Sequence, residues 1–190
     1  TYLLRRGDPM SPGRWVKAGV PSAFDNIEIP FEVKPPWPRT YKTGRRLAFA
    51  KWLTHPKHPL TSRVMVNRIW KHHFGKGIVR TLENFGHAGA RPTHPNLLDW
   101  LANEFIQLGW SMKAMHRLIM TSSTYRQSSV VNTTQSRIDP DNFFLSRMPM
   151  RRMEAEVLRD TFFLVSGRLN ERQYGPPDPV YERQDGLVTS

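Results

Sequence analysis

The feature that most constrains the fold is a series of segments between residues 43 and 167 in which apolar residues recur every three or four positions. This spacing places them on one face of an α-helix. Most of the segments are followed by a residue that stops helices, namely Pro56, Gly75, Gly109 and Gly167. The pattern therefore predicts a mainly α fold of about five packed helices, with a short β-containing N-terminal arm.

The predicted helices cover residues 43–54, 61–74, 93–108, 111–122 and 150–166. We expect Thr43 and Ser111 to cap two of them, because a hydroxyl oxygen at this position accepts a hydrogen bond from a free backbone N–H. The expected core faces are Leu47, Ala50 and Leu53 in the first helix, Met65 and Ile69 in the second, Leu97, Leu101, Phe105 and Leu108 in the third, Met112, Met115, Leu118 and Ile119 in the fourth, and Met153, Val157, Leu158, Phe162 and Val165 in the last. Core positions are also expected for Trp52, Trp70, Trp100 and Trp110.

The two ends of the chain differ in pattern from the helical core, which we predict at residues 43–167. Residues 1–42 predict an N-terminal arm with short strands near residues 2–4, 15–16 and 31–33, followed by a proline-rich linker. Residues 168–190 predict an irregular tail. Within the core, the polar stretch 128–137 is interpreted as a mobile surface loop.

The chain is strongly basic, with 28 Lys and Arg against 16 Asp and Glu and a formal net charge of +12. Arg accounts for 20 of the 28, and its planar guanidinium favours paired contacts with carboxylate, sulfate or phosphate. The net positive charge is compatible with a solvated basic surface and with a polyanion partner, and the sequence does not decide between them. The absence of cysteine excludes disulfides, thiolate metal sites and a cysteine nucleophile within this chain. No apolar run is long enough for membrane insertion.

Exposed tryptophans beside basic residues are candidates for ligand contact. Trp15 and Trp37 lie in the irregular N-terminal part, next to Arg14 and Arg39. An indole face stacks on a flat ring while a neighbouring cation pairs with an anionic group. We therefore take Arg14, Trp15, Trp37 and Arg39 as a candidate patch for sugars or nucleotides.

A second candidate site is a polar centre between the second and the last helix. It would bring Arg63 and Asn67 together with Arg152, Glu154 and Glu156. Such a group of charges is typical of a salt-bridged scaffold, and it could also form the floor of a hydrolytic active site, with His87 or His94 beside it. The sequence leaves these two interpretations open, and it identifies no catalytic residue.

The seven histidines do not have the spacing of a helical metal site, which requires two of them four residues apart. A site assembled from the loop residues His55, His58, His87 and His94 is the alternative, but surface or hydrogen-bonding histidines are the simpler reading. We predict no metal and no cofactor.

Ordered motif blocks then connect the chain to a known family. The blocks are LAFAKWLT at 47–54, HPLTSRVMVNRIWKHHFGKGIVRT at 58–81, ENFGHAGARPTHPNLLDWLANEFIQLGWSMKAMHRLIMTSSTYRQSS at 83–129, DPDNFFLSR at 139–147 and MRRMEAEVLRDTFFLVSGRL at 150–169. In these the chain resembles a planctomycete-specific domain of unknown function, found C-terminal to cytochrome-c-like modules in large secreted proteins. The resemblance implies an extracytoplasmic location and a chain that is a fragment, truncated at its C-terminus. The family supplies no catalytic residues.

These observations favour a non-catalytic structural or binding module of a larger extracytoplasmic protein. Its expected partners are other modules of the same polypeptide or an anionic polysaccharide. A hydrolytic enzyme built on the polar centre is one alternative. A nucleic-acid-binding domain is the other and is suggested by charge alone, since the sequence contains no recognisable nucleic-acid-binding motif.

Overall fold

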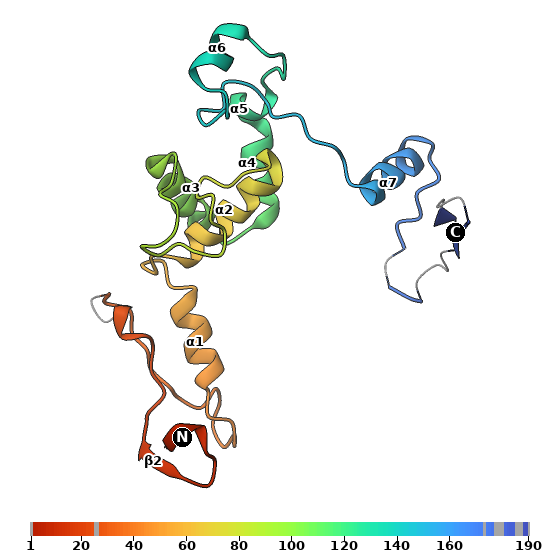
Figure 1. The fold of residues 1–190 in the computed structure, drawn as a ribbon. Coiled ribbons are helices and arrows are strands. Elements are labelled where there is room, and N and C mark those ends of the chain that lie inside the picture. The colour runs from red at the N-terminus through yellow and green to blue at the C-terminus, as the bar shows by residue number, and fades with distance from the viewer. Residues whose placement is uncertain (1, 25–26, 173, 177–180, 185–187, 190) are drawn as a thin grey trace. The chain divides into compact units, whose positions relative to one another are not determined.

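The computed structural model describes residues 2–24, 27–172, 174–176, 181–184 and 188–189 (Figure 1). The chain forms two compact units, Thr1–Met150 and Arg151–Ser190. The N-terminal arm and most of the helices belong to the first unit, and the last long helix belongs to the second.

The prediction of a mainly α fold is confirmed. In the described part of the chain the helices are α1 (Arg45–Leu53), α2 (Thr61–Phe74), α3 (Pro95–Gln107), α4 (Met112–Thr121), α5 (Ser123–Arg126), α6 (Thr133–Ile138) and α7 (Ala155–Val165). The strands are β1 (Tyr2–Leu4), β2 (Pro12–Trp15), β3 (Tyr181–Glu182) and β4 (Val188–Thr189). Strands β1 and β2 pair antiparallel, as do β3 and β4. The two short strands of the tail, predicted to be irregular, are an addition to the expected fold.

Local signals set the ends of the central helices. Helix α2 has the predicted bounds and ends at Gly75, whose φ of 82° is left-handed and suits glycine. The Ser111 hydroxyl accepts a hydrogen bond from the Ala114 N–H at 3.3 Å, so α4 has the cap that the sequence predicts. Helix α3 ends at Gln107, one residue before the predicted end and two before Gly109.

The predicted bounds of two other helices are wrong at their starts. Helix α1 begins at Arg45 with Gly44 as its N-cap, and not with Thr43. Helix α7 begins at Ala155, five residues after the predicted start at Met150. The residues excluded from α7 include Arg151 and Arg152, and positive charges in a first turn oppose the helix dipole. The observed first turn instead contains Glu156, which the dipole favours.

The prediction that residues 128–137 form a mobile surface loop is wrong from Thr133 onwards, where α6 begins. Asn132 is its N-cap, and its Oδ1 atom accepts hydrogen bonds from the N–H groups of Thr134 and Gln135 at 2.9 and 3.3 Å. Asparagine is a strong capping residue. The cap is therefore visible in the sequence, although the polar composition hides the helix.

The core lies where α2, α3 and α4 pack together, and Figure 1 shows α2 beside α3. Its buried residues are Val66, Ile69, Trp70, Phe74, Ile78, Val79, Leu98, Leu101, Ala102, Phe105, Met115 and Ile119. Several predicted core positions lie elsewhere. Helix α1 buries Trp52, as predicted, but it buries Ala48 in place of the predicted Leu47 and Ala50. Trp100 is 48% exposed on α3, so its predicted core position is wrong.

The apolar face of α7 is also not a core face. None of the residues of α7, all of which the structure describes, is buried. Val157 is 49% exposed, Phe162 67% and Val165 84%. None of the helices formed by the described residues is long and apolar enough to cross a membrane.

In the N-terminal arm the structure confirms the first two predicted strands. The β1–β2 hairpin pairs Tyr2 with Trp15. Residues 31–33, which lie in the described part of the chain, form no strand and run as an extended segment. This segment and α1 together form the candidate site described next.

Candidate ligand-binding site

Trp37 and Arg39, two of the predicted patch residues, lie in an exposed turn that leads into α1. The Trp37 side chain is 54% exposed, and the Nζ atom of Lys42 lies 5.4 Å from its ring centre. An ammonium at this distance is attracted by the electron density of the ring face. Arg39 is exposed, with a positive φ of 61° that non-glycine residues adopt infrequently. The turn thus presents an aromatic ring and two cations to solvent.

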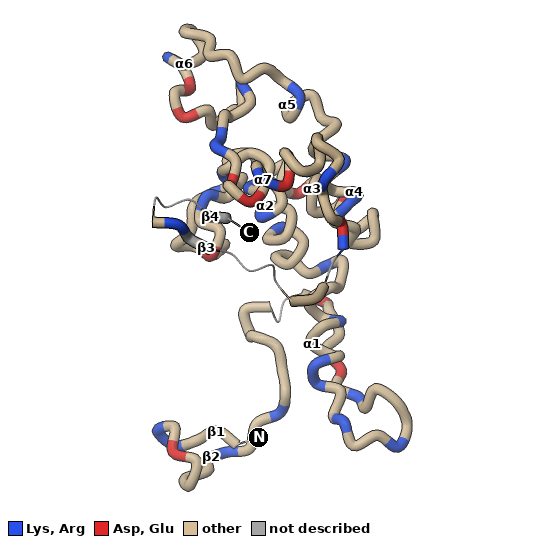
Figure 2. Tube along the Cα trace, turned by 90° about the vertical axis from the view of Figure 1, so that its right-hand side faces the viewer, with Lys and Arg blue, Asp and Glu red and all other residues tan. Residues whose placement is uncertain are grey.

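Two further cations stand at the start of α1. Arg45 and Arg46 occupy its first turn, which contains no acidic residue. The N-cap is Gly44, which has no side chain to accept a hydrogen bond from the first N–H groups of the helix. The side chains and the helix dipole therefore both attract an anion at this end. Figure 2 shows Lys and Arg gathered along this turn and helix start, and we call residues 37–46 the basic turn.

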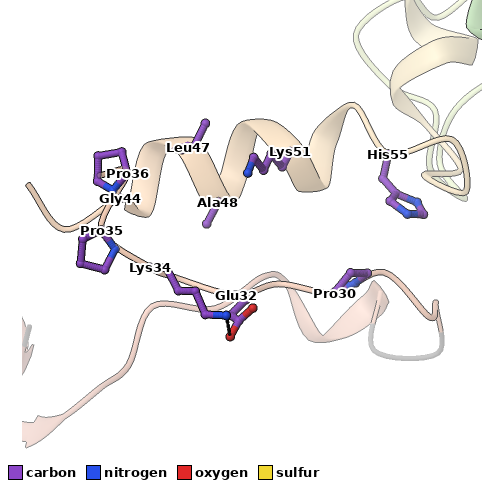
Figure 3. Close-up of a pocket in the computed structure, with 10 residues that line it drawn as sticks. All are labelled: Pro30, Glu32, Lys34, Pro35, Pro36, Gly44, Leu47, Ala48, Lys51 and His55. Carbon is purple, nitrogen blue, oxygen red and sulfur yellow. Dashed lines mark ion pairs between the residues drawn. The ribbon is translucent and has the colours of Figure 1, made fainter. Parts of the chain in front are cut away.

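A groove of about 500 Å³ lies beside the basic turn, between the extended segment 30–36 and α1 (Figure 3). It is lined by Pro30, Glu32, Lys34, Pro35, Pro36, Gly44, Leu47, Ala48, Lys51 and His55. The Lys34 Nζ atom pairs with Glu32 Oε1 at 2.6 Å, while Lys51 extends from α1. The volume is typical of a small-ligand site, and most of the charged groups in its wall are basic.

Gly44 closes one end of this groove. A Cβ atom at this position would collide with the carbonyl oxygen of Lys34, and the φ of 75° is itself unfavourable for other residues. Glycine thus allows the extended segment to approach the start of α1. The groove and the basic turn therefore depend on the same residue.

The other predicted patch residues, Arg14 and Trp15, belong to the β1–β2 hairpin. Both are exposed, Trp15 by 55%. Figure 2 shows the hairpin and the turn before α1 at different places in the arm. The patch predicted from the sequence thus consists of two separate aromatic–basic pairs, and only Trp37 and Arg39 lie in the turn next to the groove.

Arg63 and Asn67, the first-unit members of the predicted polar centre, have different surroundings: Arg63 is partly exposed, and Asn67 is buried in the core. Arg63 donates from Nε to Asp99 Oδ1 at 2.7 Å, a contact that joins α2 to α3. It also donates from Nη1 to the carbonyl of Pro59, just before α2, at 2.6 Å. Asn67 is fully buried, and its amide makes two 2.9 Å hydrogen bonds, to the N–H and to the C=O of Val79. A Cβ atom at Gly77 would lie 2.5 Å from the Val79 carbonyl oxygen, so glycine is needed beside this contact.

The other members, Arg152, Glu154 and Glu156, belong to the second unit. All three are exposed, and Glu154 is the N-cap of α7 without a side-chain capping bond. The polar centre between the second and the last helix stays a prediction.

His58 has a clear structural role. Its side chain is buried, and Nδ1 accepts hydrogen bonds from the N–H groups of Leu60 and Thr61 at 3.3 and 3.2 Å. Because N–H groups only donate, the neutral ring carries its proton on Nε2, which has no hydrogen-bond partner among the described residues. The ring of Trp52 lies perpendicular to it at 4.5 Å. Burial, and to a lesser degree the nearby His55, lower the pKa of His58 below its usual value.

The loop histidines do not form the metal site considered from the sequence. Among the residues that the structure describes, which include His55, His58, His87 and His94, no three His, Asp or Glu side chains gather so as to hold a metal ion. His94 instead contacts Thr93 Oγ1 through Nδ1 at 2.9 Å.

The structure brings together two other histidines that the sequence does not connect. His73 of α2 and His116 of α4 are 43 residues apart, and the Nε2 atom of the first lies 2.8 Å from the Nδ1 atom of the second. Both side chains are partly buried. A spacing rule for one helix cannot reveal a pair formed between two helices.

Asp139 organises a second candidate region. Its carboxylate accepts hydrogen bonds from the N–H groups of Phe143 and Phe144 at 2.8 and 2.7 Å. Burial raises its pKa, but these two bonds, with Arg147 and Arg80 nearby, outweigh burial and lower the pKa below its usual value. The Arg80 guanidinium lies 3.7 Å from the ring centre of Phe143. A cavity of about 440 Å³ opens here. Both oxygens of the Asp139 carboxylate already accept hydrogen bonds from the loop that contains Phe143 and Phe144.

With the fold and site described, the chain can be compared with known proteins. No curated protein and no solved structure matches it significantly. A family model does match, over residues 45–189, which covers α1 to β4 but leaves out the hairpin and most of the basic turn. The chain belongs to the family described as PSD1, "Protein of unknown function (DUF1553)".

Proposed function

We propose that this chain is a non-catalytic binding module of a larger extracytoplasmic protein, and that it contacts an anionic polysaccharide through the basic turn. The observation that carries the proposal is the grouping of exposed Trp37 with Arg39, Lys42, Arg45 and Arg46 beside a groove. The location is proposed from the family resemblance, and neighbouring modules of the same polypeptide are the other proposed partners.

The chemistry of the turn fits a sulfated or carboxylated sugar chain. The face of an indole ring packs against the apolar face of a sugar, and guanidinium groups pair with sulfate or carboxylate oxygens. The uncapped start of α1 adds N–H groups that attract an anion. The groove, with Lys34 and Lys51 in its wall, gives room for one further sugar unit.

The test is binding of the full chain to sulfated, carboxylated and neutral polysaccharides and to duplex DNA, each at low and at moderate salt. We expect selective binding to one acidic polysaccharide that persists at moderate salt. Trp37→Ala should weaken it about tenfold, since stacking on an aromatic ring contributes about 1–3 kcal/mol. Trp15→Ala, which removes an exposed tryptophan from the hairpin, is the matched control and should bind like the wild type.

A second pair of variants separates a shaped site from net charge. Arg39→Gln with Lys42→Gln removes two cations from the basic turn, while Lys113→Gln with Arg117→Gln removes two exposed cations from α4. Only the first pair should abolish selective binding. Equal losses in both pairs, or equal binding to every polyanion that disappears with salt, would contradict the proposal. Preferential binding to DNA would favour the nucleic-acid alternative.

A further inference from the structure

We propose that an apolar pocket between α1 and the start of α2 binds an uncharged aromatic molecule that carries a hydrogen-bond acceptor, such as a ketone oxygen. The pocket has a volume of about 410 Å³, which suits a small ligand. Phe24, Phe49, Trp52 and His58 are among the residues that line it. It shares no lining residue with the groove beside the basic turn, so the inference does not depend on the proposed function.

Three aromatic rings stand in the wall of this pocket. Trp52 of α1 is buried, and the ring of Phe49 lies nearly parallel to it at 5.9 Å between ring centres. Phe24, at the end of the short 3₁₀-helix η2 (Ser22–Phe24), packs perpendicular to Trp52 at 5.5 Å. Phe49 is still 45% exposed, so much of its surface remains available. A flat ligand ring can therefore make both stacked and edge-to-face contacts here.

The pocket disfavours a charged ligand. The described residues that line it include no Lys, Arg, Asp or Glu. Burial lowers the pKa of His58, so this ring is also neutral at neutral pH. An ionic group that entered the pocket would lose its water shell without gaining an opposite charge. The wall thus selects for an uncharged ring system.

His58 supplies the one polar contact that the proposal requires. Its Nδ1 atom accepts hydrogen bonds from the N–H groups of Leu60 and Thr61, which leaves the proton on Nε2, at another edge of the ring. Nε2 is buried and has no hydrogen-bond partner among the described residues. A buried donor without a partner is rare and unfavourable, so a ligand oxygen that accepts from Nε2 removes this cost.

A side-chain rotation has to open the way to Nε2, which is shielded from water in this structure. The ring of Phe24 lies 5.6 Å from that of His58 and is only partly buried. It is held by a helix of one turn, unlike Trp52, which is in α1. Phe24 is therefore the side chain that turns aside when the ligand enters.

The first experiment compares three probes of similar shape by NMR titration of the full chain. Acetophenone has an aromatic ring and a ketone oxygen, cumene has the same outline without an acceptor, and benzoate has a charge. Acetophenone should bind saturably, and cumene about tenfold more weakly because it leaves Nε2 without a partner. Benzoate should also bind more weakly. Equal affinity for acetophenone and cumene would overturn the proposal and leave the Trp52 ring face as the partner of Nε2. Tighter binding of benzoate would overturn it as well.

Two substitutions on α1 test the location of the site. Phe49→Ala removes a ring from the pocket wall and should weaken the binding of acetophenone and cumene alike. Leu47→Ala is the matched control, because Leu47 is 43% exposed on the same helix but lines the groove beside the basic turn. It should bind both probes like the wild type. Equal affinities in the two variants would place the probes elsewhere and contradict the proposal.

A third variant tests the role of His58. His58→Asn keeps an acceptor near the Nδ1 position and removes the Nε2 donor. It should bind acetophenone no better than cumene, and a preference as large as that of the wild type would overturn the assignment. Circular dichroism shows whether the helices are retained. Where they are not, the nitrogen-15 resonance of His58 Nε2 in the wild type decides: it should shift with acetophenone, and an unchanged resonance would contradict the proposal.

Discussion

Helices α3 and α7 share the same spacing of apolar residues, but several of these residues are buried in α3 and, among the described residues, none is buried in α7. Both place large apolar residues every three or four positions, and α3 buries Leu98, Leu101 and Phe105, while no residue of α7 is buried within the described chain. The difference teaches that an amphipathic pattern predicts a helix and a face suited to packing. It does not predict that this face is covered, because the covering residues come from other parts of the chain or from other molecules.

The largest effect expected from this comparison concerns Phe105 and Phe162. Phe105→Ala should lower the free energy of unfolding by about 3–5 kcal/mol, because it removes a fully buried ring from the core. Phe162→Ala should change it by less than about 0.5 kcal/mol, since this ring is 67% exposed. Urea unfolding followed by circular dichroism measures both. A large effect of Phe162→Ala would show that the α7 face is covered in solution.

A smaller loss of stability is expected for Asn67, whose side chain alone fixes the loop at Val79 to α2. Asn67→Ala leaves the buried N–H and C=O of Val79 without their partner and should cost about 1–3 kcal/mol. Asn103→Ala, on the exposed face of α3, is the matched control and should have little effect. If both variants unfold at the wild-type urea concentration, Asn67 does not have the role assigned to it.

The smallest expected effect is a pH dependence of the stability, caused by His58. Its folded pKa is below the ordinary value of 6.5, so the unfolded chain binds more protons as the pH falls below that value. The stability that this histidine contributes is therefore present above pH 6.5 and is lost as the pH falls towards the lowered pKa. Thermal unfolding at several pH values should show this decline in the wild type.

Substitutions separate His58 from the other histidines. His58→Asn keeps an acceptor near the Nδ1 position but does not titrate, so the decline should be reduced. His87→Gln, which removes an exposed histidine, should leave it unchanged. An identical decline in His58→Asn would mean that other groups cause it.

Much of the helical architecture could be predicted because its signals are local. Gly75 ends α2 and Ser111 caps α4 through contacts within a few residues. The errors at α6 and α7 arose where capping and first-turn charges outweighed apolar periodicity, as with Asn132 and the Arg151–Arg152 pair. Helix α1 has no such explanation, because it begins with two arginines and without a side-chain cap.

The candidate sites could be predicted only in part. Exposed tryptophans at positions 15 and 37 were expected from their irregular, basic surroundings, and both are more than half exposed. The groove beside α1 was not expected, because it depends on the approach of Lys34 to Gly44 across ten residues of chain. Arg152, Glu154 and Glu156 remain candidates on a separate unit.

The sequence by itself determined the helical class, the ends of α2 and α4, the absence of thiol chemistry and the basic charge. These follow from residue types and from hydrogen bonds between near neighbours. Only the tertiary structure decided that Asn67 bonds to Val79 and that His73 faces His116. Such contacts depend on how helices pack, and packing is set by the shapes of many side chains that lie far apart in the sequence.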